Sequence, residues 1–206
     1  MCRTLDVKYK KSDLNDVMTK QFQHITATER HRLLHLLNKF EYLFDGTLGT
    51  WNTTRVDLEF KDNAKPLCSQ PYTVPKLHKT TFKKEFERLV SLGVLKEAND
   101  PKWGARSFDQ PKAKTNCVRL LSDFRNLNRK LKRKTYPMPE IREMLLNLEG
   151  FQYATSLHLN MGYYHIRLSD QARNLCTIIP PWGKYQYKRL PMGVSNSPDI
   201  FQEKMS

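Results

Sequence analysis

A proline-rich segment limits what the middle of this chain can fold into. Residues 64–75 (AKPLCSQPYTVP) carry three prolines in twelve positions. Proline fixes φ and donates no backbone hydrogen bond, so this stretch is unsuited to a helix interior or a central strand. The sequence therefore predicts an extended linker, with a connector before it and a folded domain after it.

The connector is predicted to contain one amphipathic helix. Thr26 and Glu29 form a T-x-x-E capping box, and the helix is expected to stop at the Asp-Gly pair of residues 45–46. Apolar residues recur between them at helical spacing: Leu33, Leu36, Leu37, Phe40 and Phe44. His31 and His35 lie one turn apart, but no third ligand is close and the HExxH glutamate is missing, so packing is favoured over zinc binding.

Three further helices are predicted after the linker. The first is followed by Gly93 in the C-terminal cap position, and its apolar face is formed by Leu77, Phe82, Phe86, Leu89 and Val90. The second begins at Pro139 and runs to Gly150, with the apolar residues Ile141, Met144, Leu145 and Leu148. The third begins at residues 197–199, where a capping serine, a first-turn proline and an aspartate coincide.

Strand patterns alternate with these helices. They cover residues 105–110, 117–122, 153–159, 164–168, 176–179 and 185–190. The last two are joined by the turn-rich sequence Pro-Pro-Trp-Gly at 180–183. This mixture predicts a fold of the α+β class.

Length and composition exclude several classes of protein. The 206 residues are 39% hydrophobic, which is enough for an ordinary domain with a core. No run of about 18 apolar residues is present, and the start lacks the apolar stretch of a signal peptide, so an intracellular protein without membrane association is expected, in the cytoplasm or the nucleus. The four cysteines lie far apart without a C-x-x-C pair, which indicates neither a zinc finger nor a disulfide framework.

Positive charge is concentrated in one part of the chain. Residues 101–134 contain eleven basic and two acidic residues, a net charge of +9 out of +14 for the whole chain. Such a segment is typical of polyanion binding, although a solvated basic face or a localisation signal gives the same composition. Trp103, Phe108 and Phe124 interleave with the charges and favour folded structure over a disordered arm.

Four segments together resemble the reverse transcriptase of gypsy-type LTR retrotransposons, from about Pro66 to the last residue. They are PYTVPKLHKTTFKKEFERLVSLGVLKEAND, PKAKTNCVRLLSDFRNLNRKLKRKTYPMP, FQYATSLHLNMGYYHIRLS and PWGKYQYKRLPMGVSNSPDIFQEKM, in the order that this family uses. The resemblance implies the fingers and a partial palm of a right-hand polymerase, without thumb and distal palm. A fragment of a longer fold is therefore expected.

The resemblance also implies subdomain boundaries. Residues 1–65 would be a connector upstream of the polymerase, 66–136 the first part of the fingers and 137–167 the first part of the palm. Residues 168–191 would be the second part of the fingers, and 192–206 the truncated start of a palm helix.

Five residues would contact the incoming nucleotide by this resemblance. Lys112 and Arg119 would lie on the two arms of the fingers hairpin and hold the triphosphate. Tyr163 matches the steric gate against a ribose 2′-hydroxyl, and Met192 and Gly193 would lie near the nascent base pair. Ordinary solvated charges are the alternative for the first two, and space filling is the alternative for Met192.

The resemblance also gives expected roles to the two residues beside Tyr163 and to the polar and basic residues from Arg125 to Lys134. Tyr164 is expected to pack in the core, whereas Gly162 would let the backbone approach the nucleotide sugar. Arg125 and Asn128 would contact the template strand. A basic run after them is also assigned to nucleic-acid binding: Arg129, Lys130, Lys132, Arg133 and Lys134.

The chain departs from the family pattern where catalysis needs carboxylates. The family uses dNTPs and two Mg²⁺ ions, but His158 stands where the first catalytic aspartate is expected, and residues 150–169 contain no acid. No two aspartates are adjacent, so the Y-x-D-D turn is also missing. Mg²⁺ binding is therefore predicted to be lost, with no metal site. Arg106 stands where the family commonly has proline.

These observations predict a fragment of a retrotransposon reverse transcriptase that is catalytically inactive as given. Its expected partners are an RNA or DNA primer-template and either an intact polymerase or the rest of a retroelement polyprotein. The alternative is a non-catalytic nucleic-acid-binding remnant or a partner of an intact polymerase. Decayed coding sequence that never folds stably is a third interpretation.

Overall fold

The computed structural model describes residues 11–52, 55–62, 64–99, 101–111, 118–148, 150, 155 and 157–206. Contacts within the chain divide it into two compact units, Met1–Gly49 and Thr50–Ser206. The division precedes the proline-rich segment, because Val56 and Phe60 already form backbone bridges with Leu168 and Leu131 of the second unit. The described residues between 50 and 65 thus fold with the second unit. The assignment of residue ranges to connector, fingers and palm stays a prediction.

The described residues of the first unit form two α-helices and a 3-10 turn. Helix α1 (Leu14–Gln21) begins at Asp13, whose carboxylate accepts hydrogen bonds from two backbone N–H groups of the first turn. Helix α2 (Ala27–Lys39) begins with the predicted capping box. It ends earlier than the sequence predicts, and the 3-10 turn η1 (Glu41–Phe44) follows. The apolar spacing continues across this change because a 3-10 turn has nearly the helical period.

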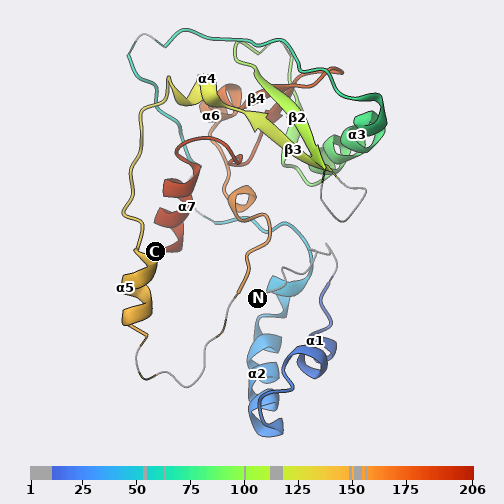
Figure 1. Cartoon of the computed structure of the whole chain (residues 1–206), viewed down its shortest axis with the longest axis vertical. Helices are drawn as coiled ribbons and strands as arrows, with labels where there is room; N and C mark the ends of the chain where they lie inside the picture. Colours follow the sequence, from blue (N-terminus) through green and yellow to red (C-terminus); the bar gives the residue numbers. More distant parts are fainter. Residues whose placement is uncertain are drawn as a thin grey trace. The chain divides into compact units, whose positions relative to one another are not determined.

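One mixed sheet forms the framework of the second unit among the residues that the structure describes. Its strands are β1 (Leu95–Glu97), β2 (Ala105–Pro111), β3 (Val118–Asp123), β4 (Thr177–Ile179) and β5 (Tyr185–Tyr187). Their order is β1-β5-β4-β2-β3, and every neighbouring pair is antiparallel except β2–β4. The two strands from the C-terminal third therefore lie between β1 and the β2–β3 hairpin, and Figure 1 shows β4 beside β2. The α+β expectation is confirmed by this arrangement.

Helix α3 (Lys76–Ser91) supplies the aromatic part of the core. Phe82 and Phe86 are buried and contact the ring of Trp182 edge to face. The predicted apolar face was too wide, because Leu77 and Val90 are exposed. At 3.6 residues per turn Leu77 lies about 140° around the helix from Phe82, on the opposite side.

The other helices of the second unit are short. They are α4 (Arg125–Asn128), α5 (Ile141–Leu146), the 3-10 turn η2 (Gly162–His165), α6 (Asp170–Leu175) and α7 (Ser197–Met205). The predicted helix beginning at Pro139 is present as α5, two residues later, but its apolar residues are exposed. Helix α7 begins as predicted at Ser197, although Asn196 occupies the cap position. None of the described helices is long and apolar enough to cross a membrane.

Two predicted strands are not found as strands. Residues 164–168 form the end of η2 and then isolated bridges from Arg167 and Leu168. Residues 157–159, the described end of the predicted strand 153–159, have no ladder partner and are exposed; residues 151–154 and 156 lie outside the described residues. A strand needs a neighbouring strand for its backbone hydrogen bonds, so an alternating pattern alone does not determine it.

Candidate nucleic-acid interface

The β2–β3 hairpin carries Arg119, one of the two residues predicted to hold the triphosphate. The two strands pair in antiparallel register from Arg106 opposite Asp123 to Pro111 opposite Val118. This confirms the hairpin that the sequence predicts. Arg119 lies opposite Gln110 near the hairpin end and is exposed, whereas Lys112 lies outside the described residues. A cation on β3 is thus presented to solvent, as a phosphate contact requires.

The turn after His158 packs against helix α7. Met161 has a left-handed backbone with φ 53°, and η2 begins at the next residue. A Cβ added to Gly162 would lie 3.0 Å from the ring of Phe201, and the ring centroid of Tyr163 is 5.2 Å from the same ring. The glycine is therefore needed for close packing on Phe201. Tyr164 is buried, as its core-packing interpretation predicts.

His158 lies on an exposed, irregular segment, not in a strand. Imidazole is a neutral nitrogen ligand, whereas Mg²⁺ prefers carboxylate and other oxygen ligands. The surrounding residues 150–169 supply no carboxylate, and no three His, Cys, Asp or Glu side chains among the described residues are grouped closely enough to hold an ion. The residues at this position therefore do not fit the two-Mg²⁺ site of the family.

The loop before α7 is fastened to α4 by Asn128. Its side-chain amide donates a hydrogen bond of 2.8 Å to the carbonyl of Gly193, and its oxygen accepts one of 2.9 Å from the N–H of Ser195. Gly193 has φ +91°, and an added Cβ would lie 3.2 Å from the carbonyl oxygen of Ser122. Met192 is exposed beside it. The structure thus uses the Asn128 side chain to hold this loop, in addition to its predicted template contact.

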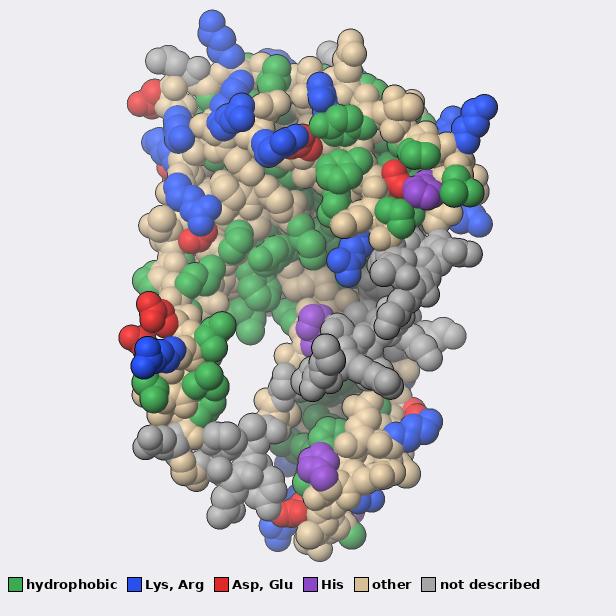
Figure 2. Space-filling model, viewed as in Figure 1, with side chains coloured by type: hydrophobic (Ala, Val, Ile, Leu, Met, Phe, Trp, Pro, Cys, Tyr) green, Lys and Arg blue, Asp and Glu red, His purple; other side chains and the backbone are tan. Residues whose placement is uncertain are grey.

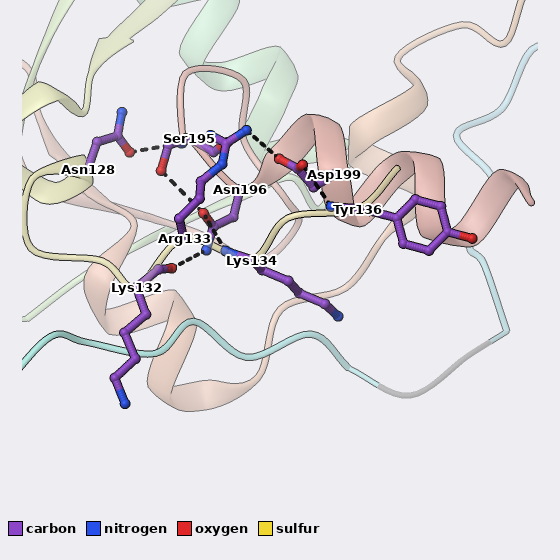
Figure 3. Close-up of polar contacts among 8 residues, drawn as sticks. All are labelled: Asn128, Lys132, Arg133, Lys134, Tyr136, Ser195, Asn196 and Asp199. Atoms are coloured by element: carbon purple, nitrogen blue, oxygen red, sulfur yellow. Dashed lines mark hydrogen bonds and ion pairs between the residues drawn. The ribbon is translucent and has the colours of Figure 1, made fainter. Parts of the chain in front are cut away.

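Part of the basic run is used to hold α7 in place. Arg133 forms an ion pair of 2.7 Å with Asp199 (Figure 3). Lys134 forms one of 2.6 Å with Glu203. Asp199 is almost fully buried and also accepts a hydrogen bond of 3.1 Å from the backbone N–H of Tyr136. These contacts tie residues 133–136 to the first two turns of the helix.

The side chain of Asn196 also connects the start of α7 to the backbone of the basic run. The amide of Asn196 donates to the carbonyl of Lys132 at 2.9 Å, and its oxygen accepts from the backbone N–H of Lys134 at 3.4 Å (Figure 3). The ammonium of Lys132 lies 3.9 Å from Glu59. Asn196 and Asp199 thus hold residues 132–136 beside α7. The sequence did not predict these two residues as partners of the basic run, because they lie more than 60 residues away from it.

The other cations of the run differ in their contacts. Lys130 donates to the carbonyl of Lys65 and lies 5.2 Å from the ring centroid of Trp103. Arg129 is exposed and forms no ion pair with the described residues. Figure 2 shows Lys and Arg side chains spread over the upper part of the visible face, where Figure 1 places β2, β3 and α4. Arg119, Arg125 and Arg129 are the exposed arginines of this region.

Arg125 is held by an acid two residues before it. Its Nε and Nη2 lie 2.8 and 2.7 Å from the two carboxylate oxygens of Asp123. The guanidinium holds the pKa of Asp123 down at about 2, because hydrogen bonds and charge both favour the ionised carboxylate. The hydroxyl of Tyr72 donates to the same carboxylate at 3.3 Å. The predicted template contact Arg125 is therefore preoriented at the surface.

The sequence of this chain is similar to known reverse transcriptase sequences. The family described as "Reverse transcriptase (RNA-dependent DNA polymerase)" matches residues 110–206. The Pol polyprotein from transposon gypsy of Drosophila melanogaster is 30% identical over 205 residues, which cover 93% of this chain and 18% of that protein. The polyprotein from transposon 297 of the same organism is 28% identical over 193 residues, with 90% and 18% covered. The chain thus spans about a fifth of the length of these relatives.

Solved structures have the same fold. A foamy viral protease-reverse transcriptase in complex with an RNA/DNA hybrid superposes with a TM-score of 0.82 at 18% identity, covering 98% of this chain and 28% of that chain. The native prototype foamy virus enzyme gives a TM-score of 0.81, also at 18% identity, with 98% and 28% covered. From the matching family segment, the retrotransposon relatives and the shared fold, the chain belongs to the reverse transcriptase family and is similar to part of the retrotransposon Pol polyproteins.

Proposed function

We propose that this chain binds an RNA or DNA primer-template and does not by itself add nucleotides to it. The observation that carries the binding is the exposed arginine surface on β3 and α4, formed by Arg119, Arg125 and Arg129. Arginine contacts to phosphates position a strand without reading its sequence. The foamy viral relative with the same fold was solved with an RNA/DNA hybrid, which supports this ligand class.

We attribute the proposed lack of nucleotide addition to His158, the residue at the expected position of the first catalytic aspartate. Two-metal nucleotidyl transfer needs ionised oxygens that hold Mg²⁺ beside the primer hydroxyl and the triphosphate. His158 offers a neutral nitrogen, and the surrounding segment offers no acid. No step of the reaction is assigned to this chain, although dNTP contacts at Arg119, Tyr163, Met192 and Gly193 are part of the proposal, together with Lys112.

We also propose subdomain ranges, a protein partner and a cellular compartment for this chain. Residues 66–136 and 168–191 act as the fingers, and residues 137–167 and 192–206 as part of the palm, with 1–65 as the connector. The proposed protein partner is the rest of a Pol polyprotein or an intact polymerase, since the relatives carry this segment within much longer chains. The proposed compartment is the cytoplasm or the nucleus, where such a template is found.

A paired binding and extension assay tests this proposal. The whole chain is titrated into a fluorescently labelled RNA–DNA primer-template at several salt concentrations, and the same mixture then receives Mg²⁺ and dNTPs. We expect saturable binding with a steep salt dependence and no primer extension above the no-protein control. Each phosphate neutralised on duplex DNA contributes about 0.9 to the slope of log K against log salt. Mg²⁺-dependent extension would overturn the claim of inactivity, and absent binding would overturn the claim of a nucleic-acid ligand.

A further inference from the structure

A polar pocket lies where strand β2, helix α4 and the proline-rich segment meet. Its lining residues are Ser69, Tyr72, Arg106, Asp123, Arg125, Asn126 and Arg129. Three of them are arginines, and Asp123 is the one acid among these described lining residues, so the lining has a net charge of +2. Cations that converge with so little compensation repel one another unless an anion lies between them.

Asp123, the acid among these lining residues, already accepts hydrogen bonds at both carboxylate oxygens. Both carboxylate oxygens of Asp123 accept from Arg125, and one of them also accepts from the hydroxyl of Tyr72. Asp123 therefore orients Arg125 and leaves the other two guanidinium groups uncompensated. Within the part of the chain that the structure describes, neither Arg106 nor Arg129 forms an ion pair.

Arg106 is held in place without using its donors. Its guanidinium carbon lies 4.9 Å from the ring centroid of Tyr72, and the ring of Phe108 contacts Tyr72 edge to face at 6.0 Å. A cation over an aromatic face orients the planar guanidinium and consumes none of its five N–H groups. Those groups remain available to an oxygen-rich ligand, and a guanidinium fork suits phosphate oxygens.

We propose that this pocket binds a backbone phosphate of the nucleic-acid strand, with Arg106 and Arg129 as its direct contacts and Asp123 and Tyr72 as positioning residues. The inference rests on the proposed primer-template binding and adds a site to it.

A nucleic-acid strand fits the pocket better than an incoming nucleotide. Arg119, the residue proposed to hold the triphosphate, lies four residues along β3 from Asp123, which is about 13 Å on an extended strand. That distance separates the pocket from the triphosphate contact. Because the two proposed direct contacts, Arg106 and Arg129, are to a phosphate, binding at the pocket is expected to be independent of sequence.

The test measures the affinity of the labelled primer-template for the whole chain and for single variants, across salt concentrations. We expect Arg106→Gln to weaken binding roughly tenfold, the loss of one charge-assisted hydrogen bond, and to lower the salt slope by about 0.9. Arg129→Gln should give the same pattern and is an independent check, since its exposed side chain has no described partner whose loss would affect folding. Arg106→Lys should keep the slope, because the charge remains, while losing affinity with the planar fork.

Arg32→Gln is the matched control, because it removes the same charge from an exposed position of α2 in the first unit. If both pocket variants bind like this control while the wild type binds normally, the pocket proposal is wrong and the proposed function stands. If the wild type fails to bind, both are wrong. If the pocket variants lose affinity for a fluorescent dNTP and keep it for the strand, the assignment to a strand phosphate is overturned.

Discussion

Replacing Asp199 should destabilise the second unit strongly, because this carboxylate ties α7 to the segment after α4. Asp199 is buried, pairs with Arg133 at 2.7 Å and accepts from the backbone N–H of Tyr136 at 3.1 Å. Asp199→Ala removes both contacts and leaves that N–H unsatisfied. The connection matters for function because the loop of Met192 and Gly193 leads directly into α7.

The expected magnitude follows from the two partners. A hydrogen bond to a charged group contributes about 1.5–3 kcal/mol to stability. The Arg133 side chain is 53% exposed, so water replaces much of its lost ion pair. We therefore expect Asp199→Ala to lower the free energy of unfolding by about 2–3 kcal/mol. Asp199→Asn, which keeps an acceptor for Tyr136 and loses the charge, should cost about 1 kcal/mol.

Urea unfolding followed by tryptophan fluorescence measures this effect. All three tryptophans, Trp51, Trp103 and Trp182, lie in the second unit, so their emission reports that unit. The control is Glu203→Ala, which breaks the neighbouring exposed ion pair of α7 and should cost at most about 1 kcal/mol. The reasoning is refuted if Asp199→Ala costs no more than Glu203→Ala.

Three other changes test separate parts of the structure. Gly193→Ala should cost about 1–3 kcal/mol in urea unfolding, because its positive φ combines with a close carbonyl oxygen; Gly93→Ala, at φ +66° in open space, should cost less. Phe86→Ala should cost about 3–5 kcal/mol, and Leu77→Ala at an exposed position less than about 0.5 kcal/mol, in the same assay. The pKa of Asp123 is lowered to about 2 in the folded chain, so its ionised carboxylate stabilises the fold above pH 4. This stabilisation is lost as the pH falls towards 2. The stability gap between wild type and Asp123→Asn should therefore shrink from pH 5 to pH 3, and a constant gap would contradict the assignment.

Local signals in the sequence predicted much of the fold. The capping box at Thr26 and Glu29, helix α3 with its Gly93 terminus, the β2–β3 hairpin and the start of α7 all depend on residues close in sequence. Periodicity and capping are properties of such short stretches. The width of an apolar face is less certain, as Leu77 shows, because it depends on what packs against the helix.

Long-range pairing could not be predicted from these patterns. Strand β4 lies beside β2, about 70 residues earlier in the chain, and residues 164–168 form a 3-10 turn and bridges despite an alternating pattern. Both outcomes depend on which segments meet in the folded chain.

The same reason explains why the ion pairs of the basic run were not predicted from the sequence. Glu59, Asp199 and Glu203 lie far from the basic run in sequence and pair with three of its five cations. Part of the charge of this run is thus paired within the fold, while its role in nucleic-acid binding stays a prediction. The pocket at Arg106 was missed for a related reason, because it combines residues from three separate segments.

The most direct test of the account is fluorescence anisotropy of a labelled RNA–DNA primer-template titrated with the whole chain at several salt concentrations. The account predicts saturable binding whose affinity falls steeply as salt rises, with a log–log slope that corresponds to several phosphates. Tryptophan emission of the same sample confirms that the second unit is folded. A folded chain that shows no saturable binding at low salt would contradict the account.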